Sequence, residues 1–197
     1  KKIIPFSLAL LLALLLGTGS AVAATTEIIS VSSSGQPGPT SDHNAWTLSD
    51  ISNDGRYVVF TNDAQLTPDD VDPSYYRKDT YLRDRVAGTT VLLSSSNFNG
   101  ARSYTNFAPV ISGNGDYIAL RATAVQAPGA DGKIGDLLLI HRPSGTMEVA
   151  VQGSYSATFD VDNQGNLYYL DDPDGSSYGS MRQIYKYERV AHSSSLI

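Results

Sequence analysis

One predicted loop, residues 62–78, combines acidic side chains with aromatic rings. The residues of interest in it are Asp69, Asp70, Asp72, Tyr75 and Tyr76. Carboxylate oxygens bind hard cations such as Ca²⁺, and aromatic rings stack on a sugar or a peptide. Acidic residues are also common in solvated turns, and this spacing matches no fixed calcium loop. We predict these five as binding residues for a protein, peptide or glycan, with bound calcium and a plain solvated loop as alternatives.

A second acidic motif lies in residues 160–171. Asp160, Asp162, Gln164, Gly165 and Asp171 have the spacing of the ligand positions in an EF-hand calcium loop. Glutamine is a poor ligand at the fifth position, and the twelfth position of such loops is a glutamate. Because the same residues have the pattern of a tight β-hairpin turn, we favour the turn over a metal site.

The possible nucleophiles and bases do not assemble into a catalytic set. Residues 175–179 match the G-x-S-x-G pattern of a serine-hydrolase elbow. That elbow needs a strand before it and a helix after it, whereas residues 181–188 have a strand pattern. His43, His141 and His192 are scattered along the chain without a visible catalytic partner. We therefore assign no catalytic residue and favour a protein that is not an enzyme.

The composition limits the class of protein that carries these residues. The chain has 197 residues, 41% of them hydrophobic, and no cysteine. It is long enough for one substantial core, and a disulfide scaffold is excluded. The formal net charge of −6 at pH 7 argues against a nucleic-acid partner, because phosphates require a concentrated basic face.

The first 23 residues have the three parts of a secretory signal peptide. Lys1 and Lys2 precede an apolar run over residues 3–16, and a small-residue cleavage site ends at Ala23. The apolar run is shorter than the ~20 residues that a membrane-spanning helix needs. We expect cleavage after Ala23, export to the periplasm or the medium, and no stable membrane insertion afterwards.

A repeat organises the rest of the chain. Segments 50–60, 110–120 and 160–170 each place a glycine turn between β-branched or aromatic runs, which predicts three hairpins. A third strand and then a fourth follow the hairpins. Four strands repeated about every 50 residues are typical of β-propeller blades, with a β-sandwich of unrelated hairpins as the alternative. The predicted blades cover residues 46–94, 107–151 and 157–197.

Both ends of the repeat region predict a ring that is larger than this chain. Residues 25–33 resemble the fourth strand near residues 89–96, which predicts a strand that closes the last blade. Residues 195–197 fall where the third blade begins its own fourth strand. Because propellers have about 4 to 8 blades, we expect a fragment of a ring of about six to eight blades.

Three stretches of the first blade carry a family pattern: residues 51–61, 79–85 and 88–90. They resemble the TolB-type propeller repeat, a WD-like family of exported bacterial proteins. The resemblance covers nearly all of the chain after the signal peptide and implies a role in protein assemblies of the cell envelope. Gln183 replaces the aspartate found at Asp79 and Asp136. The resemblance implies an α/β domain followed by a propeller, whereas here the propeller pattern starts directly after the signal peptide.

The two faces of such a ring differ in their connections. The loops from the second to the third strand of a blade, and from the fourth strand to the next blade, share one face. In this chain these loops are long, and they include the acidic loop of residues 62–78. Because long loops on a rigid scaffold usually carry binding, we predict an exported, non-catalytic binding or scaffolding module that uses this face. The alternative is the propeller domain of a secreted hydrolase, such as a prolyl-oligopeptidase-like peptidase, whose catalytic part lies beyond Ile197.

Overall fold

The computed structural model describes residues 26–38, 48–70, 79–94, 109–122, 135–154, 158–171 and 182–197. Within these stretches the chain forms strands and turns. The strands are β1 (Ser49–Ile51), β2 (Tyr57–Asn62), β3 (Asp79–Asp84), β4 (Thr89–Leu92), β5 (Val110–Ile111), β6 (Tyr117–Ala122), β7 (Asp136–His141), β8 (Thr146–Val151), β9 (Phe159–Val161), β10 (Leu167–Asp171), β11 (Gln183–Glu188) and β12 (Ser193–Leu196). No helix long and apolar enough to cross a membrane occurs in these stretches.

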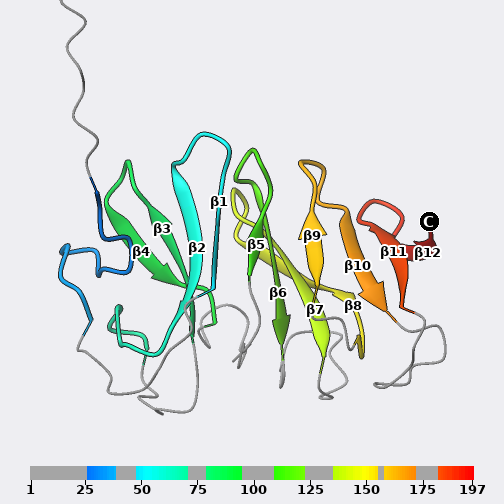
Figure 1. The fold of residues 1–197 in the computed structure, drawn as a ribbon, viewed down its shortest axis with the longest axis horizontal. Coiled ribbons are helices and arrows are strands. Elements are labelled where there is room, and N and C mark those ends of the chain that lie inside the picture. The colour runs from blue at the N-terminus through cyan, green and yellow to red at the C-terminus, as the bar shows by residue number, and fades with distance from the viewer. Residues whose placement is uncertain are drawn as a thin grey trace, which may run out of the picture.

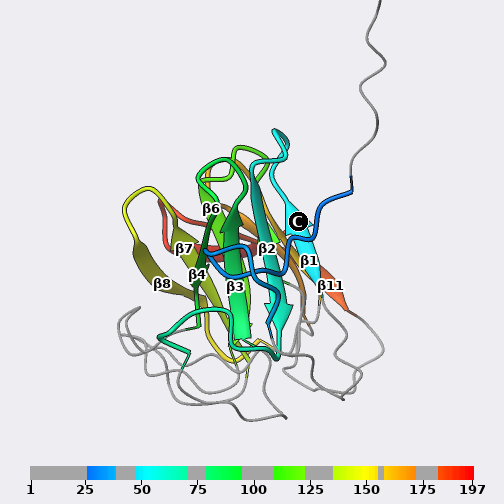
Figure 2. The ribbon, with the colours of Figure 1, turned by 90° about the vertical axis from the view of Figure 1, so that its left-hand side faces the viewer.

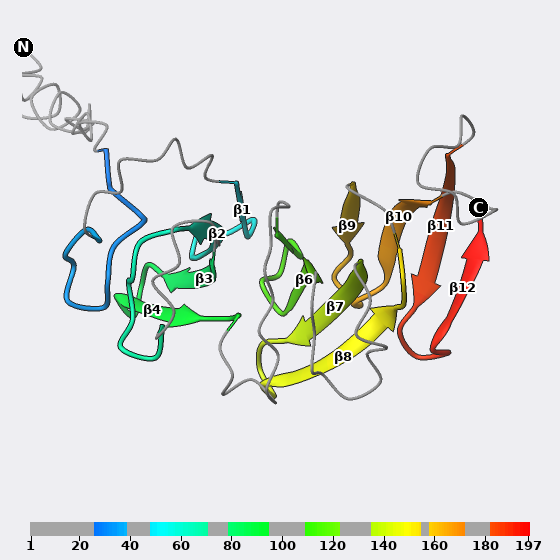
Figure 3. The same ribbon diagram turned by 90° about the horizontal axis from the view of Figure 1, so that it is seen from below.

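The strands form three antiparallel four-stranded sheets, each made of consecutive strands. We call β1–β4 blade one, β5–β8 blade two and β9–β12 blade three. The sheets stand side by side like a fan, with β1, β5 and β9 on the inner side and β4, β8 and β12 on the outer side (Figures 1 and 3). This is the blade arrangement of a β-propeller, and it confirms the predicted all-β fold of four-stranded blades.

The two ends of the repeat region differ in part from the sequence expectation. β12 already begins at Ser193, so blade three has all four strands, whereas the sequence pattern predicted the start of this strand at residues 195–197. Within the described part of the predicted closing strand 25–33, no residue joins one of the three sheets. Residues 26–38 contain one isolated bridge, between Val31 and Pro37. The closure of a ring by this segment stays a prediction.

The first hairpin turn has the same hydrogen bonds in blades one and two. Ser52 N donates to Tyr57 O at 2.9 Å, and Ser52 Oγ accepts from Tyr57 N at 3.0 Å. Ser112 and Tyr117 repeat these bonds at 2.8 and 2.9 Å. Gly115 turns the chain with a φ of 76°, a conformation that favours glycine. The shared turn confirms that the two hairpins are equivalent.

Blade three makes this turn with one residue fewer. Asp162 N donates to Asn166 O at 3.0 Å, so Asn166 stands where the other blades have a tyrosine. Leu167 consequently pairs with Val161 and is buried in the apolar cluster that blade three shares with blade two. An alignment of the sequence by its glycines places Leu167 with the two tyrosines, and the structure corrects this by one residue.

Apolar side chains fill the space between neighbouring blades. Val59 and Leu82 of blade one pack with Ile118 and Leu138 of blade two in one buried cluster. A second cluster joins blades two and three. Burying a side chain of this size contributes about 1.5–3 kcal/mol. Both faces of blade two are therefore covered. The apolar run of β7, residues 137–140, is typical of a strand that is buried on both faces.

The outer face of blade one is covered by the chain itself. Val58, Phe60 and Tyr81 pack with Leu66 from the loop after β2 and with Ile29 from the N-terminal segment. Figure 2 shows this N-terminal segment, in blue, crossing in front of the sheet. Two segments that are distant in sequence are therefore held over the same blade.

An arginine begins the third-to-fourth turn of each blade. The guanidinium of Arg142 lies 4.0 Å from the ring centre of Tyr57 in blade one, and that of Arg189 lies 5.2 Å from the ring of Tyr117 in blade two. Arg85 forms a salt bridge with the N-terminal segment. Each such turn thus fastens its blade to the element that precedes it.

Candidate functional site

The predicted binding loop is described in part. Asp69 and Asp70 lie in the described stretch that ends at residue 70, whereas Asp72, Tyr75 and Tyr76 lie outside the described residues. Asp69 is exposed and Asp70 is buried. Neighbouring acids of the same type therefore occupy different environments.

The carboxylate of Asp70 is bound within the blade. The hydroxyl of Tyr81, in β3, donates to Asp70 Oδ2 at 2.6 Å and lies 3.0 Å from Ala64 O. Burial and this carboxylate raise the pKa of Tyr81 well above its ordinary value, so the hydroxyl stays a donor. Gln65 Nε2 also donates to Asp70 O at 2.6 Å. Asp70 therefore holds the loop against the sheet, and its predicted role in binding a ligand stays untested.

Asp69 projects from a tight turn. Asp70 N donates to Thr67 O at 3.2 Å, which closes a four-residue turn with Pro68 and Asp69 at its corners. Proline in the second position of such a turn fixes the backbone angle that the turn requires. Because Asp70 is hydrogen-bonded to Tyr81 of the sheet, the position of this turn, and with it that of the exposed Asp69, is fixed.

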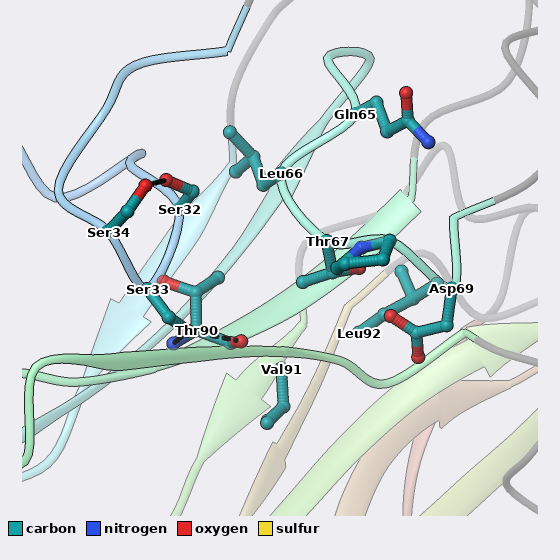
Figure 4. A pocket seen from close by; sticks show the side chains of 11 residues that line it. Ser32, Ser33, Ser34, Gln65, Leu66, Thr67, Asp69, Thr90, Val91 and Leu92 are labelled. Atoms are coloured by element: carbon teal, nitrogen blue, oxygen red, sulfur yellow. Dashed lines mark hydrogen bonds between the residues drawn. The ribbon is translucent and has the colours of Figure 1, made fainter.

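A groove of about 730 Å³ lies beside this turn, at the outer rim of blade one. Its lining residues are Ser32, Ser33, Ser34, Gln65, Leu66, Thr67, Pro68, Asp69, Thr90, Val91 and Leu92. Figure 4 shows the three serines on one side, residues 65–69 on the other and the β4 residues between them. Residues 65–69 of the groove belong to the long loop after β2. The serine wall lies beside the third-to-fourth turn at the other end of the blade, because Arg83 Nη1 donates to both Ser32 O and Gly88 O.

Hydrogen bonds to β4 fix the serine wall of the groove. Ser33 Oγ donates to Thr90 O at 3.2 Å and accepts from Thr90 N at 2.9 Å. Thr90 Oγ1 donates to Val31 O at 2.6 Å, and Arg83 Nη1 donates to Ser32 O at 3.2 Å. The N-terminal segment is thus bound to the edge of β4 mainly through side chains.

Two polar groups distinguish the opposite wall. Among the described residues that line the groove, Asp69 is the one that carries a charge. Thr67 is 8% exposed, and its Oγ1 is fully buried and has no hydrogen-bond partner within the described residues. A buried hydroxyl without a partner costs about 1–3 kcal/mol. The groove therefore offers one exposed carboxylate, Asp69, whereas the hydroxyl of Thr67 lies beneath its surface.

The EF-hand-like segment forms a hairpin turn. Asp162 Oδ1 accepts from the backbone N of Gln164 and of Asn166, each at 2.9 Å, and Asp162 Oδ2 accepts from Asn166 Nδ2 at 2.9 Å. Burial raises the pKa of Asp162, but these hydrogen bonds outweigh it and lower the pKa below its ordinary value. No cluster of three or more His, Asp or Glu suited to a metal ion occurs in the described stretches.

The described histidines take part in turns and blade contacts. His141 Nδ1 lies 2.7 Å from Ser144 Oγ within the turn that leads to β8, and its ring packs on Tyr117. His192 Nδ1 lies 3.1 Å from the hydroxyl of Tyr187. His43 and the G-x-S-x-G segment lie outside the described residues.

Sequence reasoning identified the acidic loop but missed its partners in the groove. Ser32, Ser33 and Thr90 belong to segments far from the loop in sequence, and serine and threonine are common in any surface segment. The one available signal was the similarity between residues 25–33 and the fourth strand, which marks the N-terminal segment as a partner for a blade edge.

The fold and the groove together define a β-propeller module with a candidate binding site at its rim. No protein-family model and no curated protein sequence matches the chain.

Three of the solved structures that are similar to the chain are two TolB proteins and a prolyl endopeptidase. TolB from Acinetobacter baumannii is 15% identical with a TM-score of 0.49, over 82% of this chain and 33% of that protein. A putative TolB from Agrobacterium tumefaciens is 11% identical with a TM-score of 0.48, over 80% and 50%. A prolyl endopeptidase is 11% identical with a TM-score of 0.46, over 77% and 21%. The chain thus spans half or less of each.

Proposed function

We propose that this chain is part of an exported propeller that binds a protein, peptide or glycan partner on its long-loop side, without catalysis of its own. The observation that supports this proposal is the groove at the rim of blade one. Its walls come from two segments held over the same sheet, and its exposed carboxylate, Asp69, stands on a braced turn. A rigid scaffold with a fixed groove suits recognition, since little order must be gained on binding.

The proposed export rests on the signal-peptide pattern of residues 1–23, and the proposed envelope role rests on the TolB-type repeat pattern. In the described blades, Asp162 of the EF-hand-like pattern and His141, a possible catalytic base, make hydrogen bonds within turns. These contacts favour a scaffold over an enzyme for this part of the protein.

Site-specific photo-crosslinking in the native host tests the proposal. A photoreactive residue at Ser34, at the groove, is compared with one at Val190, which is 84% exposed in a tight turn of blade three. We expect a defined partner to crosslink from position 34 and not from position 190. The same adducts from both positions, or none from position 34, would overturn the proposal.

The hydrolase alternative is tested by the intact mass of the protein secreted by its native source. A closed ring of about six to eight blades of about 50 residues has a mass of roughly 30–45 kDa. A mass in that range supports a binding propeller. A mass larger by a whole domain supports the hydrolase alternative.

A further inference from the structure

The side of blade three that faces away from blade two has the pattern of a contact surface. We propose that this side binds a further four-stranded blade of the same polypeptide, and that Asp160 joins the two by accepting a hydrogen bond from a backbone N–H of that blade's first strand. The inference rests on the propeller part of the proposed function and not on the groove. Three observations support it: the position of Asp160, exposed apolar side chains, and the contacts that already join the three blades.

Strand pairing defines which side chains lie on this side. Paired residues of neighbouring strands lie on the same side of a sheet, and successive residues of a strand alternate between its two sides. Phe159, Tyr169 and Tyr185 face blade two in a shared apolar cluster. In Figure 3 blade three stands at the end of the fan. Its opposite side, which we call the open face, therefore carries Asp160, Tyr168, Leu170, Ile184, Lys186 and Glu188.

A carboxylate joins the first strands of blades one and two. Asp50, in β1, pairs with Val59 on the side that faces blade two. Its Oδ1 accepts from the backbone N of Ile51 at 2.8 Å. Its Oδ2 accepts from the backbone N of Ile111, in β5 of blade two, at 2.9 Å. The same carboxylate thus stabilises its own strand and holds the first strand of the next blade.

Asp160 has the same place in blade three. It pairs with Tyr168 on the open face, and its Oδ1 accepts from the backbone N of Val161 at 2.8 Å, which is the bond that Asp50 makes with Ile51. Among the described residues, none donates to Asp160 Oδ2. Asp160 therefore repeats the part of the contact that lies within its own blade, and its second oxygen can accept from the first strand of a following blade.

The open face also exposes apolar surface of a kind that the other blades bury. Val59 of blade one and Ala119 of blade two stand at the position of Tyr168, and both are fully buried in the contact with the next blade. Tyr168 and Leu170 are half-buried, and Ile184 is 50% exposed. These three side chains help to line a hollow of about 600 Å³. The apolar face of a neighbouring sheet would bury them in the same way as the existing blades bury one another.

The rest of the open face limits the chemistry of the partner. Near the third-to-fourth turn, Lys186 Nζ donates to Glu188 Oε1 at 2.9 Å and lies 6.0 Å from the ring centre of Tyr168. Asn166 stands where the preceding blades have the tyrosine that receives an arginine. The further blade should therefore be apolar at the long-loop end of blade three and polar near this turn, and it should make its contact without an arginine–tyrosine pair.

Single cysteine variants of the full-length protein from the native source test the inference, because this chain contains no cysteine. Ile184→Cys reports on the open face, and Val91→Cys, at a strand residue of blade one that is 45% exposed, is the matched control. Maleimide labelling should be at least about tenfold slower at position 184, because a thiol beneath another blade reacts only when the structure opens locally. Both positions should react alike in urea, and the wild type gives the background. Equal rates in the folded protein would overturn the inference.

Three further variants isolate the carboxylate in the Ile184→Cys protein. Asp160→Ala should raise the labelling rate at position 184 about tenfold, the change from losing one hydrogen bond to a charged group. Asp160→Asn keeps an oxygen that accepts and should raise the rate less. Asp69→Ala removes the same charge from blade one and should leave the rate unchanged. An unchanged rate in Asp160→Ala, or an equal rise in Asp69→Ala, would refute the role of Asp160.

Dilution distinguishes a further blade from a second copy of the chain. Protection of position 184 should not change with protein concentration, since a blade of the same polypeptide is present at every concentration. Protection that is lost on dilution would mean that a second copy covers the open face, and the inference would be wrong. The crosslink from position 34 reports on the groove alone. If position 184 reacts freely while that crosslink persists, this inference fails and the proposed binding site stands.

Discussion

The hydrogen bond from Tyr81 to Asp70 should be a principal support of the binding loop. Tyr81→Phe keeps the ring, so no cavity forms, and removes a hydroxyl that lies 2.6 Å from a buried carboxylate oxygen and 3.0 Å from Ala64 O. A hydrogen bond to a charged group contributes about 1.5–3 kcal/mol, and the second contact is with a neutral carbonyl. We expect the variant to lose about 2–3 kcal/mol of unfolding free energy.

Equilibrium urea unfolding of the wild type and the variant measures this loss. Tyr168→Phe is the matched control, because its hydroxyl lies 3.4 Å from Asp162 Oδ2 and the residue is only half-buried. A bond of that length contributes little, so this control should stay within about 0.5 kcal/mol of the wild type. The slope of unfolding free energy against urea should be the same for all three proteins.

Two results would refute the reasoning. Tyr81→Phe could unfold within about 0.5 kcal/mol of the wild type, which would mean that Asp70 finds an equal partner without the hydroxyl. Alternatively, the two variants could lose equal stability, which would mean that the loss reflects tyrosine in general and not this contact. Tyr81→Phe should also weaken crosslinking of a partner from position 34 at the groove, because the turn that presents Asp69 is held through Asp70.

Two more predictions concern the tight turns at the end of the blades that lies opposite the long loops. Arg56 donates to Asp84 and lowers the pKa of that carboxyl from 3.8 to about 2, so the pair stabilises the fold above about pH 4 and this contribution is lost as the pH falls through 2. Asp84→Asn should therefore lower the unfolding free energy by about 1 kcal/mol at pH 7, less than the full pKa shift implies because Arg56 is partly exposed. The unfolding free energy measured in urea should then depend less on pH below pH 4 than it does in the wild type. An unchanged pH dependence would contradict this prediction. Gly115→Ala places a Cβ 2.7 Å from the Tyr57 ring at a φ of 76°, whereas Gly145→Ala, at 66°, meets nothing within 4 Å. Thermal unfolding should show the larger loss for position 115, and equal losses would refute the role of this contact.

The sequence predicted the strands well because both of their signals are local. Each hairpin combines a glycine turn with β-branched or aromatic flanks, and the pattern of Ser52 to Tyr57 returns at Ser112 to Tyr117 with the same bonds. The shortened turn of blade three was missed because Gly165 stays in place while one residue after it is absent. A deletion on one side of a turn shifts the strand register without altering the visible motif.

The candidate site was harder to predict because it depends on burial and on distant segments. Asp69 and Asp70 are identical in type and adjacent, yet the hydroxyl of Tyr81, in another strand, makes one of them structural. The serine wall depends on hydrogen bonds between Ser33 and Thr90, which lie 57 residues apart. Neither the burial of a single side chain nor a hydrogen bond between distant segments produces a periodic pattern in one sequence.

The arginines at the third-to-fourth turns repeat the same contact between successive blades. Blades one and two carry both residues of this contact: an arginine in the third-to-fourth turn and a tyrosine whose ring receives the arginine of the next blade. A copy of blade one or blade two would therefore bring with it both residues that this contact needs, so the contact can be repeated along the chain without a change at either position. Asn166 interrupts this series, so a unit that follows blade three must be joined by other contacts.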